Sequence, residues 1–423
     1  MIDRHSLNSE INLGTYKVNF LDQDGRTFSE GEVTASQIFQ PKQNLVFRLI
    51  RGKFKLRDES ISPFALLNID RCTFIDLDKT VDIAITNIQL GKEFDASFII
   101  LKTPLSFDSG NRLKLVNFNL VNFNKEVHKS EFEFDGWKVR LDRIANEDQY
   151  KQLPDIGGYL ITHKGKFVRK DGSEFEINDA NLVTSFLYNL FSFCKGVSTP
   201  AFLVEGLDSN NDLAWYEIGS YPLRAWKDCH NWFLDSRIDI NSFADGFYHF
   251  SNEEPYKNYF NEVNYWYSLA NGSLDNYTGV IIAHTALELM SWLYLIEDKK
   301  VLSVNGFNNL PAGDLFALTL EYCSIPINVQ DELNNLIKLG KANNLNGPLL
   351  FSTIRNKIVH PPSKRRDEFT NDGTTIFEAK LLGIWYLELF ILSKSKLEGK
   401  YVNILKYKGY RGETELLPWS KNA

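Results

Sequence analysis

The feature that most constrains the fold is a change in the spacing of apolar residues near residue 250. Before it, from about Ile11 to Ile177, short runs alternate apolar and polar residues and are separated by turn signals. That period of two favours the strands of a sandwich or barrel. From about Glu253, apolar residues recur every three to four positions, as in amphipathic helices. We therefore predict an α+β fold, with a β-rich N-terminal region followed by an all-α helical bundle.

Three regions are expected along the chain. Residues 1–135 form a β-rich domain, 136–250 a mixed α/β region, and 251–423 a helical domain with a C-terminal extension. The sequence offers no match to the glycine-rich phosphate loops, to the nucleophile elbow of hydrolases or to a zinc-ligand pattern. Chemistry of those classes is therefore not favoured.

Two Asp-Gly pairs predict tight turns in the N-terminal half. Asp24-Gly25 should join TYKVNF to TFSEGEV, and Asp171-Gly172 should join KFVR to SEFEI. Asp-Gly favours hairpins because both residues tolerate positive φ. A helix is expected after Asn178, ending at Gly196, and a hairpin of AFLVEG and LAWYEIG should follow it.

The helical domain should hold four to six helices packed as a bundle. The segments with helical spacing are 253–272, 276–300, 313–323, 329–342, 347–362 and 375–397. The last is apolar almost all round, which places it either at the centre of the bundle or at a subunit interface. The apolar window from Thr278 to Ile296 contains His284 and Glu288, so we expect a core helix there and no membrane span.

The composition narrows the kinds of partner and the cellular compartment that we expect for the chain. The chain has 54 acidic and 47 basic residues, a net charge of −7, which argues against a general nucleic-acid coat but allows a local basic cleft. Its four cysteines lie far apart without a CxxC pair, so we expect reduced, buried thiols. The first residues lack the apolar stretch of a signal peptide. We expect a cytoplasmic protein.

One segment contains a pattern of residue types that catalytic sites use. In RNKIVH, Arg355 is followed by the polar Asn356, and His360 comes four residues after Asn356. Such spacing also arises by chance, and Arg224 with His230 gives a second match. Context separates the two matches. Arg355 lies on a helix with an apolar stripe, whereas Arg224 follows a proline in a segment without a bundle around it.

The expected geometry depends on Pro361. Five helical steps of about 100° would place Arg355 and His360 on different faces. A residue before proline is pushed out of the α region, so the helix should end at His360 and free its ring to turn towards the guanidinium. The helix dipole would favour the charged imidazole, which suits a proton donor. The residues alone also allow a C-capping histidine and an arginine in a surface ion pair.

The RNKIVH stretch and its surrounding helices resemble the RxxxxH motif of HEPN domains, over about Glu253 to Leu397. The resemblance implies a metal-independent endoribonuclease that needs no cofactor and works as a homodimer or larger. It also implies that a ribose 2′-hydroxyl attacks the adjacent phosphate, leaving a 2′,3′-cyclic phosphate. His360 would move protons, Arg355 would stabilise the charged phosphate, and Asn356 would hold the histidine or a phosphate oxygen.

Supporting groups are expected in two places. Lys357, Lys364, Arg365 and Arg366 form a local basic patch that either guides RNA or is a solvated loop. His284, Glu288 and Ser291 form a polar stripe on one helix. The stripe either faces the Arg355/His360 cleft, where some HEPN proteins carry an acidic residue, or faces solvent.

The order of a β-rich region before a C-terminal HEPN bundle is similar to that of ApeA-type proteins of bacterial anti-phage defence. This resemblance implies a toxin-like role in abortive infection, in which the β-rich region senses a phage-derived trigger and the bundle cuts tRNA or mRNA. The alternative hypothesis is a non-catalytic HEPN protein that binds a partner or nucleotide through its β-rich region. Neither hypothesis involves a membrane.

Overall fold

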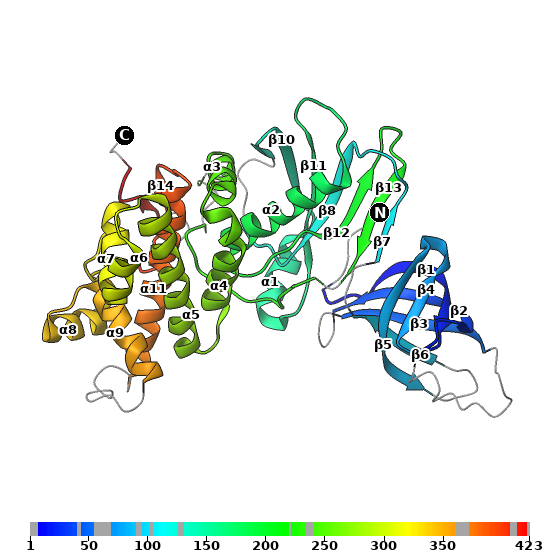
Figure 1. Cartoon of the computed structure of the whole chain (residues 1–423), viewed down its shortest axis with the longest axis horizontal. Coiled ribbons are helices and arrows are strands. Elements are labelled where there is room, and N and C mark those ends of the chain that lie inside the picture. Colours follow the sequence, from blue (N-terminus) through cyan, green and yellow to red (C-terminus); the bar gives the residue numbers. More distant parts are fainter. Residues whose placement is uncertain are drawn as a thin grey trace. The chain divides into compact units, whose positions relative to one another are not determined.

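The computed structural model describes residues 7–39, 44–54, 69–89, 95–101, 105–125, 131–219, 221–233, 238, 240–360, 372–406 and 413–420. Within them, β-rich parts precede a helical C-terminal region (Figure 1), which confirms the predicted α+β class.

The chain forms two compact units that are interleaved in sequence. Unit 1 comprises Met1–Asn122, Asp142–Asn181 and Ala201–Trp226, and unit 2 comprises Phe123–Leu141, Leu182–Pro200 and Lys227–Ala423. Two excursions from the N-terminal half therefore belong to the helical unit.

Unit 1 begins with a closed antiparallel barrel. Its six strands are β1 (Ile11–Leu21), β2 (Thr27–Ile38), β3 (Asn44–Phe54), β4 (Arg71–Phe74), β5 (Lys79–Gln89) and β6 (Asp95–Ile100), in the order β1-β2-β3-β6-β5-β4. The turn with Asp24-Gly25 joins β1 to β2 as predicted, and Gly25 has a φ of 77°. Alternate residues such as Val18 and Phe20 point into the barrel and are buried, which is the period-two pattern of the sequence.

A second antiparallel sheet follows in unit 1. This sheet has seven strands in the order β7-β13-β12-β8-β11-β10-β9. Its first five strands are β7 (Leu105–Asp108), β13 (Leu213–Ile218), β12 (Phe202–Leu207), β8 (Leu115–Val121) and β11 (Ile161–Arg169). The β12–β13 hairpin is the predicted one. Helix α1 (Glu147–Ile156) was not predicted, although Asn146 and Gln149 form a capping box at its start.

Only the turn of the predicted Asp171-Gly172 hairpin is present, and the prediction of a second strand after it is wrong. The turn forms, with Gly172 N–H donating to Arg169 O at 3.0 Å. The segment after it forms only a single bridge between Phe175 and Leu113. The reason is that helix α2 (Ile177–Lys195) begins directly after it and takes the chain away from β11.

Unit 2 holds β9 (Glu131–Phe134), most of β10 (Trp137–Arg143), which pairs with β9, most of α2, and the helices of the C-terminal region. These are α3 (Ile240–Asn252), α4 (Phe260–Gly272), α5 (Asn276–Trp292) with a π-helical turn η4 (Leu293–Asp298), α6 (Val304–Asn309), α7 (Ala312–Tyr322), α8 (Asn334–Asn343), α9 (Gly347–Val359) and α11 (Gly373–Lys394). The strands β14 (Lys400–Tyr401) and β15 (Glu415–Leu416) pair after them.

Helix α11 is the central helix of this unit. It packs against α3, α4, α5, α8 and α9 and lies among the helices of the C-terminal region in Figure 1. Nearly all its residues from Ile376 to Leu392 are buried. Of the two positions open from sequence, the structure therefore places this helix inside its own bundle. Its apolar surface is not available to a second subunit.

The helix Asn276–Asp298 is the one stretch of the described chain long and apolar enough to cross a membrane. In the bundle, 61% of its most apolar window is buried, so it serves as a core helix of unit 2. The four cysteines are free and buried, as predicted.

Candidate functional site

Helix α9 carries the RNKIVH residues and ends where the sequence predicts. Its start is capped by Asn346, whose side chain accepts a hydrogen bond from the Leu349 N–H. At its end, His360 has left the helical region, with φ −114° and ψ 82°, as expected before a proline. The His360 N–H still donates to Asn356 O at 3.0 Å, so the imidazole extends from the last turn.

Only some of the hydrogen-bond donors of the Arg355 guanidinium have an acceptor among the described residues. Nη1 donates to the Asn356 side-chain oxygen at 3.1 Å, and the residue is half-buried. Its Nε is buried, and no described residue accepts a hydrogen bond from it. A buried donor left unpaired costs about 1–3 kcal/mol. An anionic ligand with several oxygens would satisfy such a donor.

The other motif residues lie at the end of the helix. His360 and Asn356 are exposed and Lys357 is half-buried. Among the described residues, no hydrogen bond joins the side chains of Arg355 and His360. The predicted approach of the His360 ring to the guanidinium therefore stays a prediction, and a ligand that contacts both groups would bridge them. Lys364, Arg365 and Arg366 lie outside the described residues.

His284 on α5 is part of the same neighbourhood. It is 2% exposed, its Nε2 lies 3.3 Å from Ser352 Oγ on α9, and its Nδ1 lies 3.7 Å from the Glu288 carboxylate. Burial and, to a smaller extent, the charge of Arg355 lower the pKa of His284 to about 3. The ring is therefore neutral at physiological pH and does not exchange protons there.

The polar stripe of α5 turns inward over most of its length. His284 and Ser291 are buried, and Glu288 is 50% exposed. The solvent-facing alternative is therefore wrong for two of its three members. Because His284 is buried, its contacts are with Ser352 and with the electrostatic field of Arg355. A buried ring of this kind is not accessible to RNA.

We name His284, Glu288, Ser352, Arg355 and Asn356 the α5–α9 cluster. Sequence reasoning missed Ser352. A signal for it existed, because Ser352 lies three residues before Arg355 and follows the buried Phe351 on the apolar stripe. A small polar residue on a buried helix face needs a partner, and here that partner is His284. Chemically, the cluster offers the positive charge of Arg355, the half-exposed carboxylate of Glu288 and the buried, neutral imidazole of His284.

The second Arg–His match has no comparable setting. Arg224 is exposed in a segment that forms neither helix nor strand, and it belongs to unit 1. His230 belongs to unit 2, is exposed, and lies 3.5 Å from Asp228. A hydrogen bond from His230 lowers the pKa of Asp228 despite partial burial of that carboxyl.

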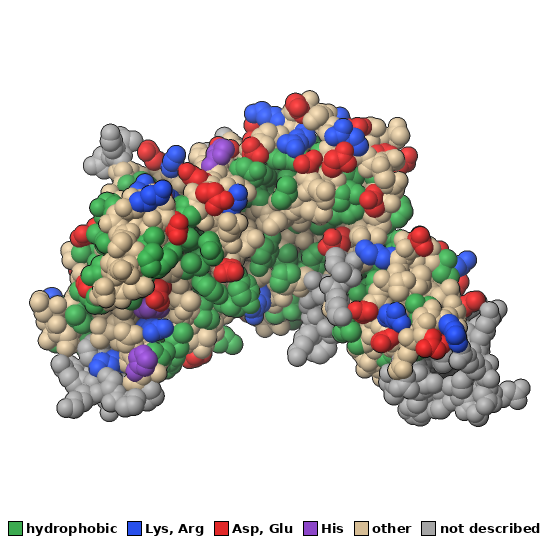
Figure 2. Space-filling model, viewed as in Figure 1, with side chains coloured by type: hydrophobic (Ala, Val, Ile, Leu, Met, Phe, Trp, Pro, Cys, Tyr) green, Lys and Arg blue, Asp and Glu red, His purple; other side chains and the backbone are tan. Residues whose placement is uncertain are grey.

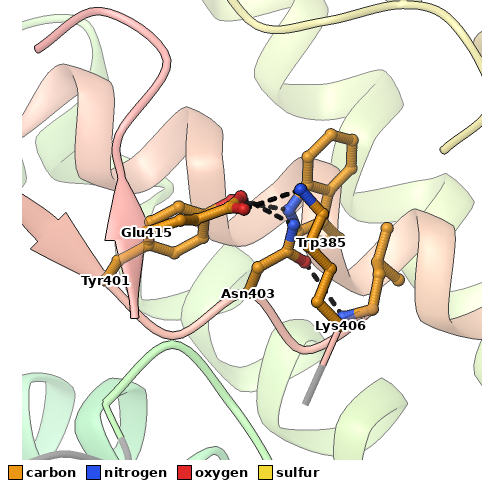
Figure 3. Close-up of polar contacts among 6 residues, drawn as sticks. Trp385, Tyr401, Asn403, Lys406 and Glu415 are labelled. Carbon is orange, nitrogen blue, oxygen red and sulfur yellow. Dashed lines mark hydrogen bonds and ion pairs between the residues drawn. The ribbon is translucent and has the colours of Figure 1, made fainter. Parts of the chain in front are cut away.

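A dense polar cluster in the C-terminal extension is structural in character (Figure 3). Trp385 on α11 donates to the Tyr401 hydroxyl at 3.1 Å, and Tyr401 donates to Glu415 at 2.9 Å. Asn403 and Lys406 donate to the two oxygens of Glu415, at 2.8 and 2.7 Å. Since both carboxylate oxygens already have partners, Glu415 serves to link β15 to Tyr401, Asn403 and Lys406, and through Tyr401 to Trp385 on α11.

The face of the molecule drawn in Figure 2 shows no large patch of one charge sign among the described residues. On the face drawn in Figure 2, basic and acidic side chains of the described residues are interspersed and do not gather by sign. This fits the net charge of −7. Any nucleic-acid contact on this face would be local.

Comparisons with known proteins relate two stretches of the chain to one group of proteins. Residues 253–415 match the YopA C-terminal domain, and residues 108–229 match the YopA central domain. A similar protein is the SPbeta prophage-derived uncharacterized protein YopA of Bacillus subtilis (strain 168), 29% identical over 355 residues, which are 80% of this chain and 79% of that one. No solved structure matches. In its central and C-terminal parts this chain is thus similar to YopA, and the α5–α9 cluster lies within the matched C-terminal range.

Proposed function

We propose that the chain is a metal-independent endoribonuclease of the HEPN type, centred on Arg355 and His360. The observation that carries the proposal is the half-buried guanidinium of Arg355, which donates to Asn356 and whose Nε has no acceptor among the described residues, near the end of the helix from which His360 extends. The resemblance of RNKIVH and its helices to the RxxxxH motif supports the same assignment.

In the proposed reaction, the ribose 2′-hydroxyl attacks the adjacent phosphorus and loses its proton to a neutral histidine. The bond from phosphorus to the 5′-oxygen breaks, and that oxygen takes a proton from a charged histidine. The products are a 2′,3′-cyclic phosphate and a 5′-hydroxyl. Arg355 would stabilise the extra negative charge on the phosphate oxygens through its fork of donors. Asn356 would keep the guanidinium in position.

This scheme uses two histidines, and each chain contributes one His360. We therefore propose a homodimer in which two copies of the end of α9 form one cleft. The interface cannot be the apolar surface of α11, because that surface is buried in its own unit. Light scattering at micromolar concentration should give twice the chain mass. A stable monomer with full cleavage activity would contradict this arrangement.

The biological setting we propose is anti-phage defence by abortive infection, with the β-rich region as sensor of a phage-derived trigger. The similar protein is described as prophage-derived, which supports a setting that involves phage. The order of regions supports the sensor role only by its similarity to ApeA-type proteins. The RNA target, tRNA or mRNA, would be found by sequencing the cut ends.

The test is expression in bacteria together with cleavage of total RNA by the purified full chain. His360→Ala and Arg355→Ala should each lose about 10²-fold or more in rate, as when a proton-transfer group or a charged stabiliser is removed. The double variant should lose little more, because the two residues act as a unit. A chelator should leave the rate unchanged, and the products should end in a cyclic phosphate.

The matched controls are Arg224→Ala and His230→Ala, which remove the second Arg–His match and should cleave as the wild type does. If His360→Ala stays fully toxic, or if cleavage requires added magnesium, the assignment fails. The non-catalytic binding protein would then be the better hypothesis.

A further inference from the structure

His284 on α5 is a polar residue at a position that favours an apolar one. Its ring is 2% exposed and packs against the rings of Phe316 on α7 and Phe351 on α9. Its Nδ1 is buried and has no hydrogen-bond partner among the described residues. Such an atom destabilises the folded state, whereas a phenylalanine would fill the same space without that cost. The imidazole therefore indicates a role beyond packing.

We propose that His284 is a positioning residue for Arg355, which fixes the turn of α9 that carries the guanidinium and leaves its charge available to a phosphate of the substrate. The inference rests on the proposed function, because it assigns His284 to the same site. His284 acts through α9 and does not touch RNA itself, since its ring is buried.

The ring of His284 is held by contacts with two other helices. Helices α5, α7 and α9 pack on one another (Figure 1). The Phe316 ring lies edge-on to the imidazole, with 4.8 Å between the centroids and 66° between the planes, and the Phe351 ring lies at 5.8 Å. His284 Nε2 lies 3.3 Å from Ser352 Oγ on α9. The hydrogen bond therefore joins a ring with a fixed place to one point on α9.

Ser352 passes this restraint to Arg355 through the backbone of α9. Residues three apart on a helix lie on the same face, about one turn along the axis. Ser352 is 6% exposed, and its hydroxyl either donates to Nε2 or accepts from it. A rotation or slide of α9 that moved Arg355 would break this contact. The pair of His284 and Ser352 thus specifies how α9 lies on α5, one turn before the guanidinium.

The neutral state of His284 preserves the charge of Arg355. Burial and, to a smaller extent, the charge of Arg355 lower the pKa of His284 to about 3, so the ring is uncharged at physiological pH. Among the described residues, no carboxylate forms an ion pair with Arg355, and the Glu288 carboxylate lies 3.7 Å from His284 Nδ1 instead. A neutral, fixed neighbour orients α9 without compensating the guanidinium, which suits a group that binds a phosphate.

The first test is cleavage by full-chain variants of an RNA oligonucleotide that contains the mapped cut site. His284→Phe keeps a ring but removes the contact with Ser352, so kcat should fall about tenfold or more with little change in KM, as for a misplaced transition-state group. Ser352→Ala should lose as much, and the double variant little more. His284→Gln places an amide near the position of Nε2 and should lose less than about threefold. In the Arg355→Ala background, His284→Phe should cause no further loss, whereas a purely structural role would add to it.

A second readout does not require cleavage. Phenylglyoxal modifies arginine side chains, and peptide mass spectrometry of the full chain gives the rate for each of them. Arg355 should be modified about threefold faster or more in His284→Phe and in Ser352→Ala, as expected when one hydrogen bond that holds α9 is lost. The matched control is Thr319→Val, which also removes a buried hydroxyl, but one that donates within α7 to Leu315 O at 2.8 Å. It should change neither the cleavage rate nor the modification of Arg355.

The outcomes separate this inference from the proposed function. If the wild type cleaves no RNA, the proposed function fails, and the modification rate of Arg355 still decides the role of His284. If Arg355→Ala cleaves poorly while His284→Phe cleaves like the wild type, the proposed function stands and the positioning role fails. The positioning role is also overturned if His284→Phe leaves the modification of Arg355 unchanged, if His284→Gln loses as much activity as His284→Phe, or if His284→Phe lowers the rate further in Arg355→Ala.

Discussion

Helix α8 depends on a residue from another helix for its N-terminal cap. The residue before it is Leu333, whose side chain forms no cap. The N–H groups of Asn335 and Leu336 donate to one carboxylate oxygen of Glu378 on α11, each at 3.0 Å. The first turn of a helix leaves four N–H groups without intrahelical partners, and Glu378 satisfies two of them. Glu378→Ala should therefore destabilise α8 and its contact with α11.

The magnitude follows from two opposing terms. A hydrogen bond to a charged group contributes about 1.5–3 kcal/mol, and loss of an ordinary N-cap costs about 0.5–2 kcal/mol. Burial raises the pKa of Glu378 despite the two N–H bonds, so the cost of burying the charge offsets part of their gain. We expect Glu378→Ala to cost about 2–3 kcal/mol. Glu378→Gln keeps an acceptor oxygen and should cost about 1 kcal/mol.

The assay is urea unfolding of the full chain, followed by circular dichroism at 222 nm, where the helices dominate. The midpoint should fall while the dependence on urea stays the same. The matched control is Glu321→Ala on α7, an exposed glutamate whose removal should change stability by less than about 0.5 kcal/mol. If Glu378→Ala behaves like this control, the capping argument is refuted. If Glu378→Gln loses as much as Glu378→Ala, the charge matters more than the acceptor.

Three further predictions concern buried contacts. Burial raises the pKa of Glu388 from 4.5 to about 8, so the folded state keeps the proton of this carboxyl while the unfolded state loses it. The free energy of unfolding therefore falls as pH rises from about 4.5 to 8. Glu388→Gln should gain stability relative to the wild type between about pH 5 and pH 8 in urea titrations. Glu415→Ala should free the C-terminal extension, seen as faster tryptic cleavage after Lys406. Gly347→Ala would place a Cβ well inside van der Waals contact of the Tyr386 hydroxyl, so it should cost about 2 kcal/mol or more, and Tyr386→Phe should restore part of it.

Each of these has an outcome that would contradict it. An unchanged stability difference between pH 5 and pH 8 would mean that Glu388 is ionised in the folded state. A tryptic pattern like that of the wild type would mean that β14 and β15 hold without Glu415. If Gly347→Ala and the double variant are equally unstable, the hydroxyl of Tyr386 is not what the added Cβ meets.

Local sequence signals determined the type of most elements and several of their ends. The Asp24-Gly25 turn, the helix before Gly196 and the end of α9 at the residue before Pro361 each depend on backbone preferences within a few residues. Helix α3 was missed although its apolar residues have helical spacing. Gly246 in its middle weakened the signal, but the close approach of the Ser395 carbonyl oxygen, which leaves no room for a Cβ, explains the glycine.

Only the tertiary structure decided how distant segments share a core. The residues from Phe123 to Leu141 and from Leu182 to Pro200 belong to the helical unit, although their own patterns match those of their sequence neighbours. The cap of α8 comes from Glu378, 42 and 43 residues away from the groups it accepts. Such contacts depend on where two elements meet, which no local window contains.

The candidate site divides in the same way. The sequence by itself placed Arg355, Asn356 and His360 at the end of one helix, because capping and the following proline are local effects. It left open which way the stripe of α5 faces, since an i, i+4, i+7 pattern specifies a face but not its neighbour. The packing of α5 on α9 decided that His284 is buried against Ser352, and burial in turn keeps its ring neutral. Whether a side chain is charged thus depended on the tertiary structure, because the cost of desolvating it is set by everything packed around it.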